Sequence, residues 1–381
     1  MIRDFQPTRR QVLFAGAAAG LAPTPPVSRV AIARARNYDA GIYDTLKALV
    51  DKAGGLGAVA KGKTVALKLN LTGNPERFPV KAGLPYRTDP STVLALCQLL
   101  AKAGARRIRI LESFFPARQD MALWARYGLD IRAIDNCGTQ VEWENTNNLG
   151  RGTQYTHLKV PFGGYVFPAY HLNHSYADCD SYVSLSKLKN HWLAGITMTM
   201  KNNFGLTPCS LYGSDAGASG NEDPKQERGA VGHNGTRTPP QGVPQELKPE
   251  SPREPGYRVP RIVVDLCAIR PVDFSVVDGI DTIRGGEGEW NSGVERISPG
   301  LLLAGRNQVC VDTVCAAVMS YDPRGVRGTG PFIRGDNTLL LAEAVGLGSA
   351  DLSKIEIAGL QMKDARMDFG PGPTGKRIGT A

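Results

Sequence analysis

Short apolar runs alternate with segments of helical period along the chain. An apolar, β-branched run at 63–70 predicts a strand, and a second run at 107–111 predicts another. Between them, Asp89 and Pro90 are typical of a helix N-cap and first turn, and Gly104 ends the apolar helical pattern that follows. This strand, helix, strand order predicts a right-handed βαβ unit and hence a parallel sheet.

The rest of the chain continues the alternation. Further strands are expected at 30–33, 181–185, 261–266, 274–277, 301–304 and 355–358, and further helices at 43–53, 118–127, 192–204, 309–319 and 337–345. The predicted fold class is therefore α/β, a mostly parallel sheet with flanking helices. We expect this region to cover 28–365, with its core at 65–358, and we expect a loose tail at 366–381.

One long segment interrupts the pattern. Residues 213–257 are rich in Gly, Pro and polar residues and have few aliphatic ones. Loops of this length within a domain are commonly lids, binding loops or disordered inserts. We therefore expect a long, flexible Gly/Pro-rich insertion that acts as a lid, with Arg228 and His233 reaching inward.

The first 22 residues predict an export signal. Arg9 and Arg10 precede an Ala- and Gly-rich apolar stretch that ends near Ala22. This stretch is shorter than the roughly 20 apolar residues that span a bilayer, and the pattern is typical of a twin-arginine signal peptide at 1–22. The alternative is an amphipathic N-terminal helix. The signal interpretation predicts a periplasmic or otherwise exported protein whose partner is the twin-arginine export machinery, with no membrane span in the mature chain.

Charge and cysteine content reduce the number of functions that the sequence supports. The formal net charge is +9 over 381 residues, but no run of five or six basic residues occurs, so nucleic-acid binding is not expected. A mildly basic cleft for a small anionic ligand is favoured instead, because clefts focus the field of a few charges. None of the seven cysteines forms a C-x-x-C pair, so the sequence has no iron–sulfur motif and its cofactor stays unknown.

Polar residues at the expected strand ends are candidate ligands of a substrate, because open parallel sheets bind ligands at the carboxyl ends of their strands. Lys68 and Asn70 lie at the end of one such strand. Lys187 and Lys189 end another and share one side of an extended segment, because side chains alternate along it. His191 follows at the expected start of a helix, where free N–H groups favour anions.

Lys201 and Asn202 lie near the other end of the same expected helix and interrupt its apolar face. We therefore assign both residues to substrate binding, together with the lysines of the preceding turn. The alternative for all these lysines is a solvated turn with snorkelling side chains.

A second group of candidates is acidic. Asp278 ends a strand, and the glycine-rich loop at 285–290 carries Glu287. Glycines let the backbone approach a ligand, and the two acids are suited to acid–base catalysis or, with Asp312 as a third acid, to holding a divalent cation. The alternatives are a glycine-rich surface turn and, for Asp312, a first-turn residue favoured by the helix dipole.

These candidates support two hypotheses. In the first, the protein is an enzyme for a small anionic substrate, with His191, Asp278 and Glu287 as catalytic residues opposite the lysines. In the second, it is a non-catalytic periplasmic ligand-binding, maturation or accessory protein. The first requires the lysine turn and the Asp278 turn to face each other across one crevice.

The segment from Ser186 to His191, followed by the run from Met200 to Gly205, resembles the signature of the domain of unknown function 362 family. Two further segments are similar to that family, one around Lys68 and one at 277–288. The resemblance covers about residues 65–358. The biochemical role of the family is not generally established, so the resemblance implies no particular reaction. Some members look like ferredoxin fusions with cysteine-rich cluster motifs, which this chain lacks.

Overall fold

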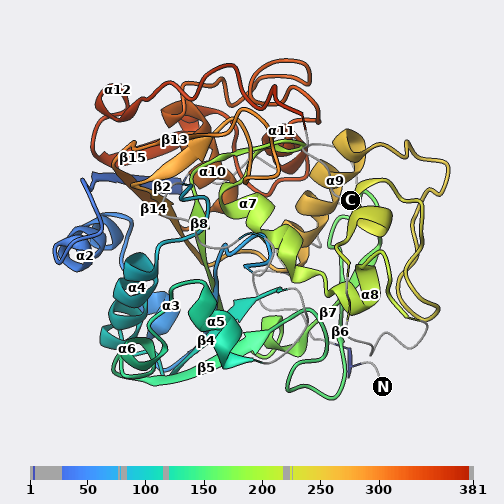
Figure 1. The fold of residues 1–381 in the computed structure, drawn as a ribbon, viewed down its shortest axis with the longest axis horizontal. Helices are drawn as coiled ribbons and strands as arrows, with labels where there is room; N and C mark the ends of the chain where they lie inside the picture. Colours follow the sequence, from blue (N-terminus) through green and yellow to red (C-terminus); the bar gives the residue numbers. More distant parts are fainter. Residues whose placement is uncertain are drawn as a thin grey trace.

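An eight-stranded sheet forms the middle of the molecule (Figure 1). The computed structural model describes residues 3, 4, 28–75, 78, 84–114, 120–217, 224 and 226–376. In spatial order the strands are β15 (Ile355–Gly359), β2 (Ser28–Arg34), β14 (Leu301–Gly305), β11 (Phe274–Gly279), β8 (Ser181–Lys187), β3 (Thr64–Lys68), β4 (Arg107–Glu112) and β5 (Gln140–Asn145). β14 is antiparallel to both neighbours, and the other pairs are parallel. The predicted mostly parallel sheet is confirmed.

Helices cover both faces of this sheet. One face carries α2 (Ile42–Lys52), α3 (Gly57–Ala60), α4 (Pro90–Lys102), α5 (Met121–Arg126) and α6 (Ile131–Asp135). The other carries α7 (Met198–Asn202), α9 (Pro255–Ile269), α10 (Gln308–Val318) and α11 (Thr338–Ala344). Each face has its own core, because alternate side chains of a strand point in opposite directions. In β2, Ala31 packs into the first core, and Val30 and Ile32 pack into the second.

Smaller elements surround these layers. They are β1 (Arg3–Asp4), β6 (Thr156–Lys159), β7 (Ala169–Leu172), β9 (Asn190–His191), β10 (Gly195–Ile196), β12 (Thr282–Arg284), β13 (Glu295–Ile297), α8 (Cys209–Tyr212) and α12 (Met362–Ala365). Apart from Arg3–Asp4, the predicted signal peptide lies outside the described residues. Within the described part of the chain, no helix has both the length and the apolar character to cross a membrane.

The signals that predicted the first βαβ unit act as expected. Asp89 accepts a hydrogen bond from the Ser91 N–H at 2.8 Å, and Pro90 occupies the first turn of α4. An N-cap of this kind satisfies a backbone donor that the helix itself leaves unpaired. The turn fixes the start of α4, so the helix returns the chain to the sheet beside β3.

The strand predicted at 261–266 is wrong, because this segment belongs to α9. The helix begins at Pro255, and nearly every residue from Arg258 to Ile269 is buried. The polar residues Arg258, Arg261 and Asp265 do recur at helical spacing, but the β-branched run at 262–264 between them has the same apolar pattern as a short buried strand.

The single helix predicted at 192–204 is also wrong. The segment first forms the β9–β10 hairpin, with Gly195 at a φ of 76°, and α7 begins only at Met198. Two side chains fix this arrangement. His191 Nδ1 accepts the Leu193 N–H at 3.1 Å, which holds the hairpin turn closed. Asp312, from α10, accepts the N–H groups of the first turn of α7.

The described part of 213–257 packs against the protein body. A single π-turn at Gly229–His233 lies on α9, and Val231 is buried. The Arg258 guanidinium, itself buried, donates to the Val231 carbonyl at 2.9 Å and to Glu246 at 2.6 Å. These contacts place the segment beside the carboxyl edge of the sheet.

Candidate functional site

The order of the strands creates a crevice between β3 and β8. From β3 the chain adds β4 and β5 on one side and then crosses to β8 on the other side. Ligands of open α/β sheets bind at such switch points, outside the carboxyl ends of the strands. A cavity of about 710 Å³ lies there. Its walls come from 68, 70–74, 78, 112–114, 127, 191, 193, 201, 202, 204, 205, 214, 226–229, 233, 287 and 290.

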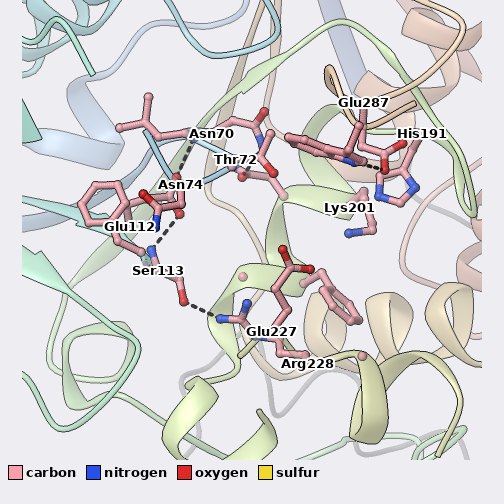
Figure 2. Close-up of a pocket in the computed structure, with 18 of the residues that line it drawn as sticks. Asn70, Thr72, Asn74, Glu112, Ser113, His191, Lys201, Glu227, Arg228 and Glu287 are labelled. Carbon is pink, nitrogen blue, oxygen red and sulfur yellow. Dashed lines mark hydrogen bonds between the residues drawn. The ribbon is translucent and has the colours of Figure 1, made fainter. Parts of the chain in front are cut away.

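Titratable side chains gather on opposite sides of the cavity. Figure 2 shows His191, Glu287 and Lys201 together on one side, with the Lys201 amine pointing toward the middle. Glu112 lies on the far side, and Arg228 borders the cavity between the two. Of the candidates from the sequence, Lys68, Asn70 and Asn202 also contribute to the walls. Asp278, Lys187, Lys189 and Asp312 do not line this cavity.

Lys201 lies in α7, on the cavity wall. Its ammonium lies 4.2 Å from the centre of the Phe204 ring. Among the described residues, the structure gives the amine no hydrogen-bond or ion-pair partner. Burial lowers its pKa from 10.5 to about 7, although the negative charge of Glu287 opposes the shift. An amine in this state exchanges a proton readily at neutral pH.

Glu287 and His191 are held in fixed positions beside Lys201. The Glu287 carboxylate accepts the backbone N–H of Trp192 and the indole N–H of Trp290, both at 2.8 Å. The Nδ1 atom of His191 accepts the N–H groups of Leu193 and Ala194. Because Nδ1 is an acceptor, the neutral ring carries its proton on Nε2. The pair therefore presents a carboxylate and an N–H donor.

Lys68 is the partner of Glu112 at the far side of the cavity. The two side chains are almost fully buried and form an ion pair. The Glu112 carboxylate also accepts the N–H groups of Leu71 and Ser113, each at 2.8 Å. Lys68 donates to the Leu69 carbonyl at 2.8 Å as well. This lysine therefore stabilises the loops that follow β3 and β4.

The two asparagines predicted to bind substrate form one amide chain. Asn70 Nδ2 donates to Asn202 Oδ1, and Asn202 Nδ2 donates to Ser184 Oγ, both at 3.0 Å. Ser184 lies in the middle of β8, so the chain connects the ends of β3 and α7 to β8 across the switch point. It gives the cavity a floor of fixed polar groups.

Lys187 and Asp278 meet on neighbouring strands, but as a buried pair. Lys187 Nζ lies 2.8 Å from Asp278 Oδ2 and 2.9 Å from the Tyr38 hydroxyl. Tyr38 in turn donates to Asp278 Oδ1 at 2.8 Å. The Lys187 and Asp278 side chains are 1% and 0% exposed, so the pair is shielded from the cavity. The sequence predicted that the two turns face each other across one crevice, but Lys187 and Asp278 lie side by side on neighbouring strands and meet through this buried pair.

Lys189 and Asp312 also make structural contacts. The Lys189 amine donates to the carbonyls of Tyr86 and Glu287, and so holds two cavity loops together. Burial lowers the pKa of Lys189 well below its usual value. Asp312 accepts the N–H groups of Thr199 and Met200, at 2.9 and 2.7 Å. Burial raises the pKa of Asp312 to about 7.

The three acids considered for a divalent cation are not brought together. Asp278 pairs with Lys187, Asp312 caps α7, and Glu287 binds two tryptophan N–H groups. Among the described residues, no group of three or more His, Cys, Asp or Glu side chains is placed to hold a metal ion. The geometry therefore adds nothing in favour of a cation at these acids.

Aromatic side chains form much of the wall, and the sequence did not single them out. They are Phe78, Phe114, Tyr127, Phe204 and Trp290. The Phe78 and Trp290 rings lie 5.2 Å apart, and Phe114 and Tyr127 stack at 4.9 Å. For Phe78 and Phe114 the available signal was positional, because residues that follow β3 and β4 at a switch point face the site. Arg228 and His233, expected to reach inward, do line the cavity.

Comparison with known proteins finds a similar curated protein and a similar solved structure. The thylakoid-associated protein sll1697 of Synechocystis sp. (strain ATCC 27184 / PCC 6803 / Kazusa) is 29% identical over 185 residues, which are 48% of this chain and 51% of that protein. The chain thus matches about half the length of that relative. The lactate racemase apoprotein from Thermoanaerobacterium thermosaccharolyticum aligns with 80% of this chain and 60% of its own, at 13% identity and a TM-score of 0.41.

The family comparison covers a larger part of the chain. The model of the domain of unknown function DUF362 matches residues 65–317. These residues include β3, β8, α7 and β11, and with them Lys201, His191 and Glu287. The chain therefore belongs to the DUF362 family.

Proposed function

We propose that this chain is an enzyme that binds a small anionic substrate in the cavity and acts on it by proton transfer through Lys201, His191 and Glu287. The observation that carries the proposal is the state of Lys201. It faces the cavity without a hydrogen-bond partner among the described residues, and its pKa is lowered to about 7. Cavity groups with perturbed pKa values are typical of catalytic sites.

The size and charge of the cavity support a small anion. Its volume, about 710 Å³, is in the range of sites for small molecules. Lys68 and Glu112 neutralise each other, which leaves Lys201 and Arg228 as the positive charges. Glu287 lies beside Lys201 and accepts two N–H groups, and Glu227 is exposed to solvent, where its charge is screened.

The surrounding groups have complementary roles. The neutral Lys201 amine accepts a proton, and the nearby Glu287 carboxylate stabilises the ammonium ion that forms. His191 donates a hydrogen bond from Nε2, because its Nδ1 is held by backbone N–H groups, and can thereby stabilise negative charge that develops on a substrate oxygen. The base and this hydrogen-bond donor therefore lie on the same side of one cavity (Figure 2).

Anion binding and proton exchange test this function together. Thermal-shift and calorimetric screens with small carboxylates and phosphates should find an anion that binds the wild-type protein. In D2O, NMR should show that the protein exchanges a C–H proton of that anion with solvent, and Lys201→Met should abolish the exchange. Binding with no exchange for any bound anion would instead support a non-catalytic ligand carrier.

We also propose that the protein is exported by the twin-arginine route. The support is the pattern of Arg9 and Arg10 before a short apolar stretch. The relative from Synechocystis is named as thylakoid-associated, which is compatible with export. In a bacterial host, the double variant Arg9→Lys/Arg10→Lys should keep the protein in the cytoplasmic fraction, while the wild type reaches the periplasm. Equal periplasmic amounts of the two would refute the route.

A further inference from the structure

Four lysines lie at the carboxyl edge of the sheet, and three of their amines are already engaged. Lys68 pairs with Glu112, Lys187 pairs with Asp278, and Lys189 donates to two backbone carbonyls. The fourth, Lys201, is the one that faces the cavity with no such partner among the described residues. Contacts within the protein therefore explain three of these lysines and leave Lys201 unexplained.

The surroundings of Lys201 suit a nucleophile. Its amine lies against the Phe204 ring, and among the described residues no carboxylate accepts a hydrogen bond from it, so no ion pair holds it in the charged form. Burial lowers its pKa to about 7, so about half of the amine is neutral at pH 7, compared with about one in 3,000 for an ordinary lysine. Desolvated lysines of this kind are the ones that attack carbonyl groups.

We propose that Lys201 forms an imine with its substrate, and that the substrate is a carbonyl compound which carries an anionic group. This inference rests on the proposed function and names the substrate class of the same cavity. The Lys201 nitrogen adds to the carbonyl carbon and the carbonyl π bond breaks. The oxygen takes up the two protons that the amine nitrogen gives up and leaves as water, and a carbon–nitrogen double bond replaces the carbon–oxygen one. Hydrolysis reverses the step without any oxidant or reductant.

Two neighbouring groups assist this step. His191 presents an Nε2–H, which can donate a hydrogen bond to the carbonyl oxygen and so polarise the carbonyl group. Glu287, held by two N–H donors, provides the negative charge that stabilises a protonated imine, and its field already acts on the Lys201 ammonium. Both lie beside the amine (Figure 2).

The walls of the cavity restrict the body of the substrate. The five aromatic side chains named above enclose a space that suits a flat ring, because stacked and edge-to-face contacts favour such a shape. Arg228 donates from Nε to the Thr207 carbonyl and from Nη2 to Ser113 and Asn147. These hydrogen bonds fix the guanidinium on the cavity wall, where its charge faces the anionic group of the substrate. An aromatic aldehyde with a carboxylate combines these features.

Reductive trapping tests the proposal on the wild-type protein. The protein is incubated at pH 7 with 4-formylbenzoate and cyanoborohydride, and labelled peptides are located by mass spectrometry. We expect Lys201 to be labelled at least about tenfold faster than the exposed Lys47, because far more of its amine is neutral. Terephthalate, which has the same ring and no aldehyde, should protect Lys201 but leave Lys47 unaffected.

The pH profile provides a second readout. Labelling at Lys201 should rise through about pH 7 and then level off, whereas labelling at Lys47 should continue to rise toward pH 10. Labelling at Lys201 that is no faster than at Lys47 overturns the imine proposal. If terephthalate still binds in that case, by calorimetry, the proposed anion-binding enzyme survives. If neither terephthalate nor any anion of the screen binds, the proposed function is overturned together with the imine proposal.

Discussion

Lys187→Met is expected to lower the free energy of unfolding by about 3–5 kcal/mol, the cost of leaving one charge of a buried pair uncompensated. The substitution removes the ammonium that lies 2.8 Å from Asp278, and both side chains are almost fully buried. Tyr38 and two backbone N–H groups would remain as the donors to this carboxylate. Chemical denaturation monitored by circular dichroism measures the change.

The same substitution at Lys201 is the matched control. Lys201→Met removes an amine without a described partner, so we expect no loss of stability at pH 7. In a second control, Asp278→Leu combined with Lys187→Met should recover much of the loss, because no buried charge is then left unpaired. Equal effects of Lys187→Met and Lys201→Met would contradict the division of the lysines into structural and reactive ones.

Glu112→Gln is expected to have two effects of opposite sign. Stability should fall by about 3–5 kcal/mol, because Lys68 loses its buried partner. In the wild type, both carboxylate oxygens of Glu112 accept backbone N–H groups, whereas the glutamine amide offers only one acceptor oxygen. Anion binding should become tighter, because a negative charge leaves the cavity wall. At an effective dielectric constant of about 20, such a charge contributes about 1–2 kcal/mol, or roughly tenfold in affinity.

Glu227→Gln is the control for this second effect. It removes the same charge from the cavity wall, but Glu227 is exposed and solvent screens it. We expect a smaller gain in anion affinity and unchanged stability. Calorimetric titration with an anion from the screen measures both variants. Weaker binding by Glu112→Gln, with the fold intact, would show that Lys68 and Glu112 do not act on the cavity as described.

Most of the sheet follows from local patterns in the sequence. β3, β4 and β11 are apolar runs that end at polar residues, and α4 carries its own N-cap at Asp89. These signals are local, so the sequence alone predicts them. The failure at α9 has a physical cause, since its β-branched run at 262–264 has the propensity of a strand, and the polar residues Arg258 and Asp265 that flank the run are buried rather than solvated.

The candidate site could be predicted only in part. Position at strand ends correctly brought Lys68, Lys187 and Lys189 to the carboxyl edge of the sheet. The sequence could not tell which of these amines would meet a carboxylate or a carbonyl. That depends on residues up to about a hundred positions away, such as Asp278 and Glu287. The distinct state of Lys201 appears only once these partners are in place.

The central claim is that the Lys201 amine, which has no hydrogen-bond or ion-pair partner in the described part of the chain, is held partly neutral in the cavity. Its pKa can be measured directly by NMR titration of the lysine side-chain nitrogen, assigned by its loss in Lys201→Met. The account predicts a midpoint near pH 7 for this one signal, with exposed lysines such as Lys47 titrating above pH 10. A Lys201 midpoint near 10.5, that of an ordinary solvated lysine, would contradict it.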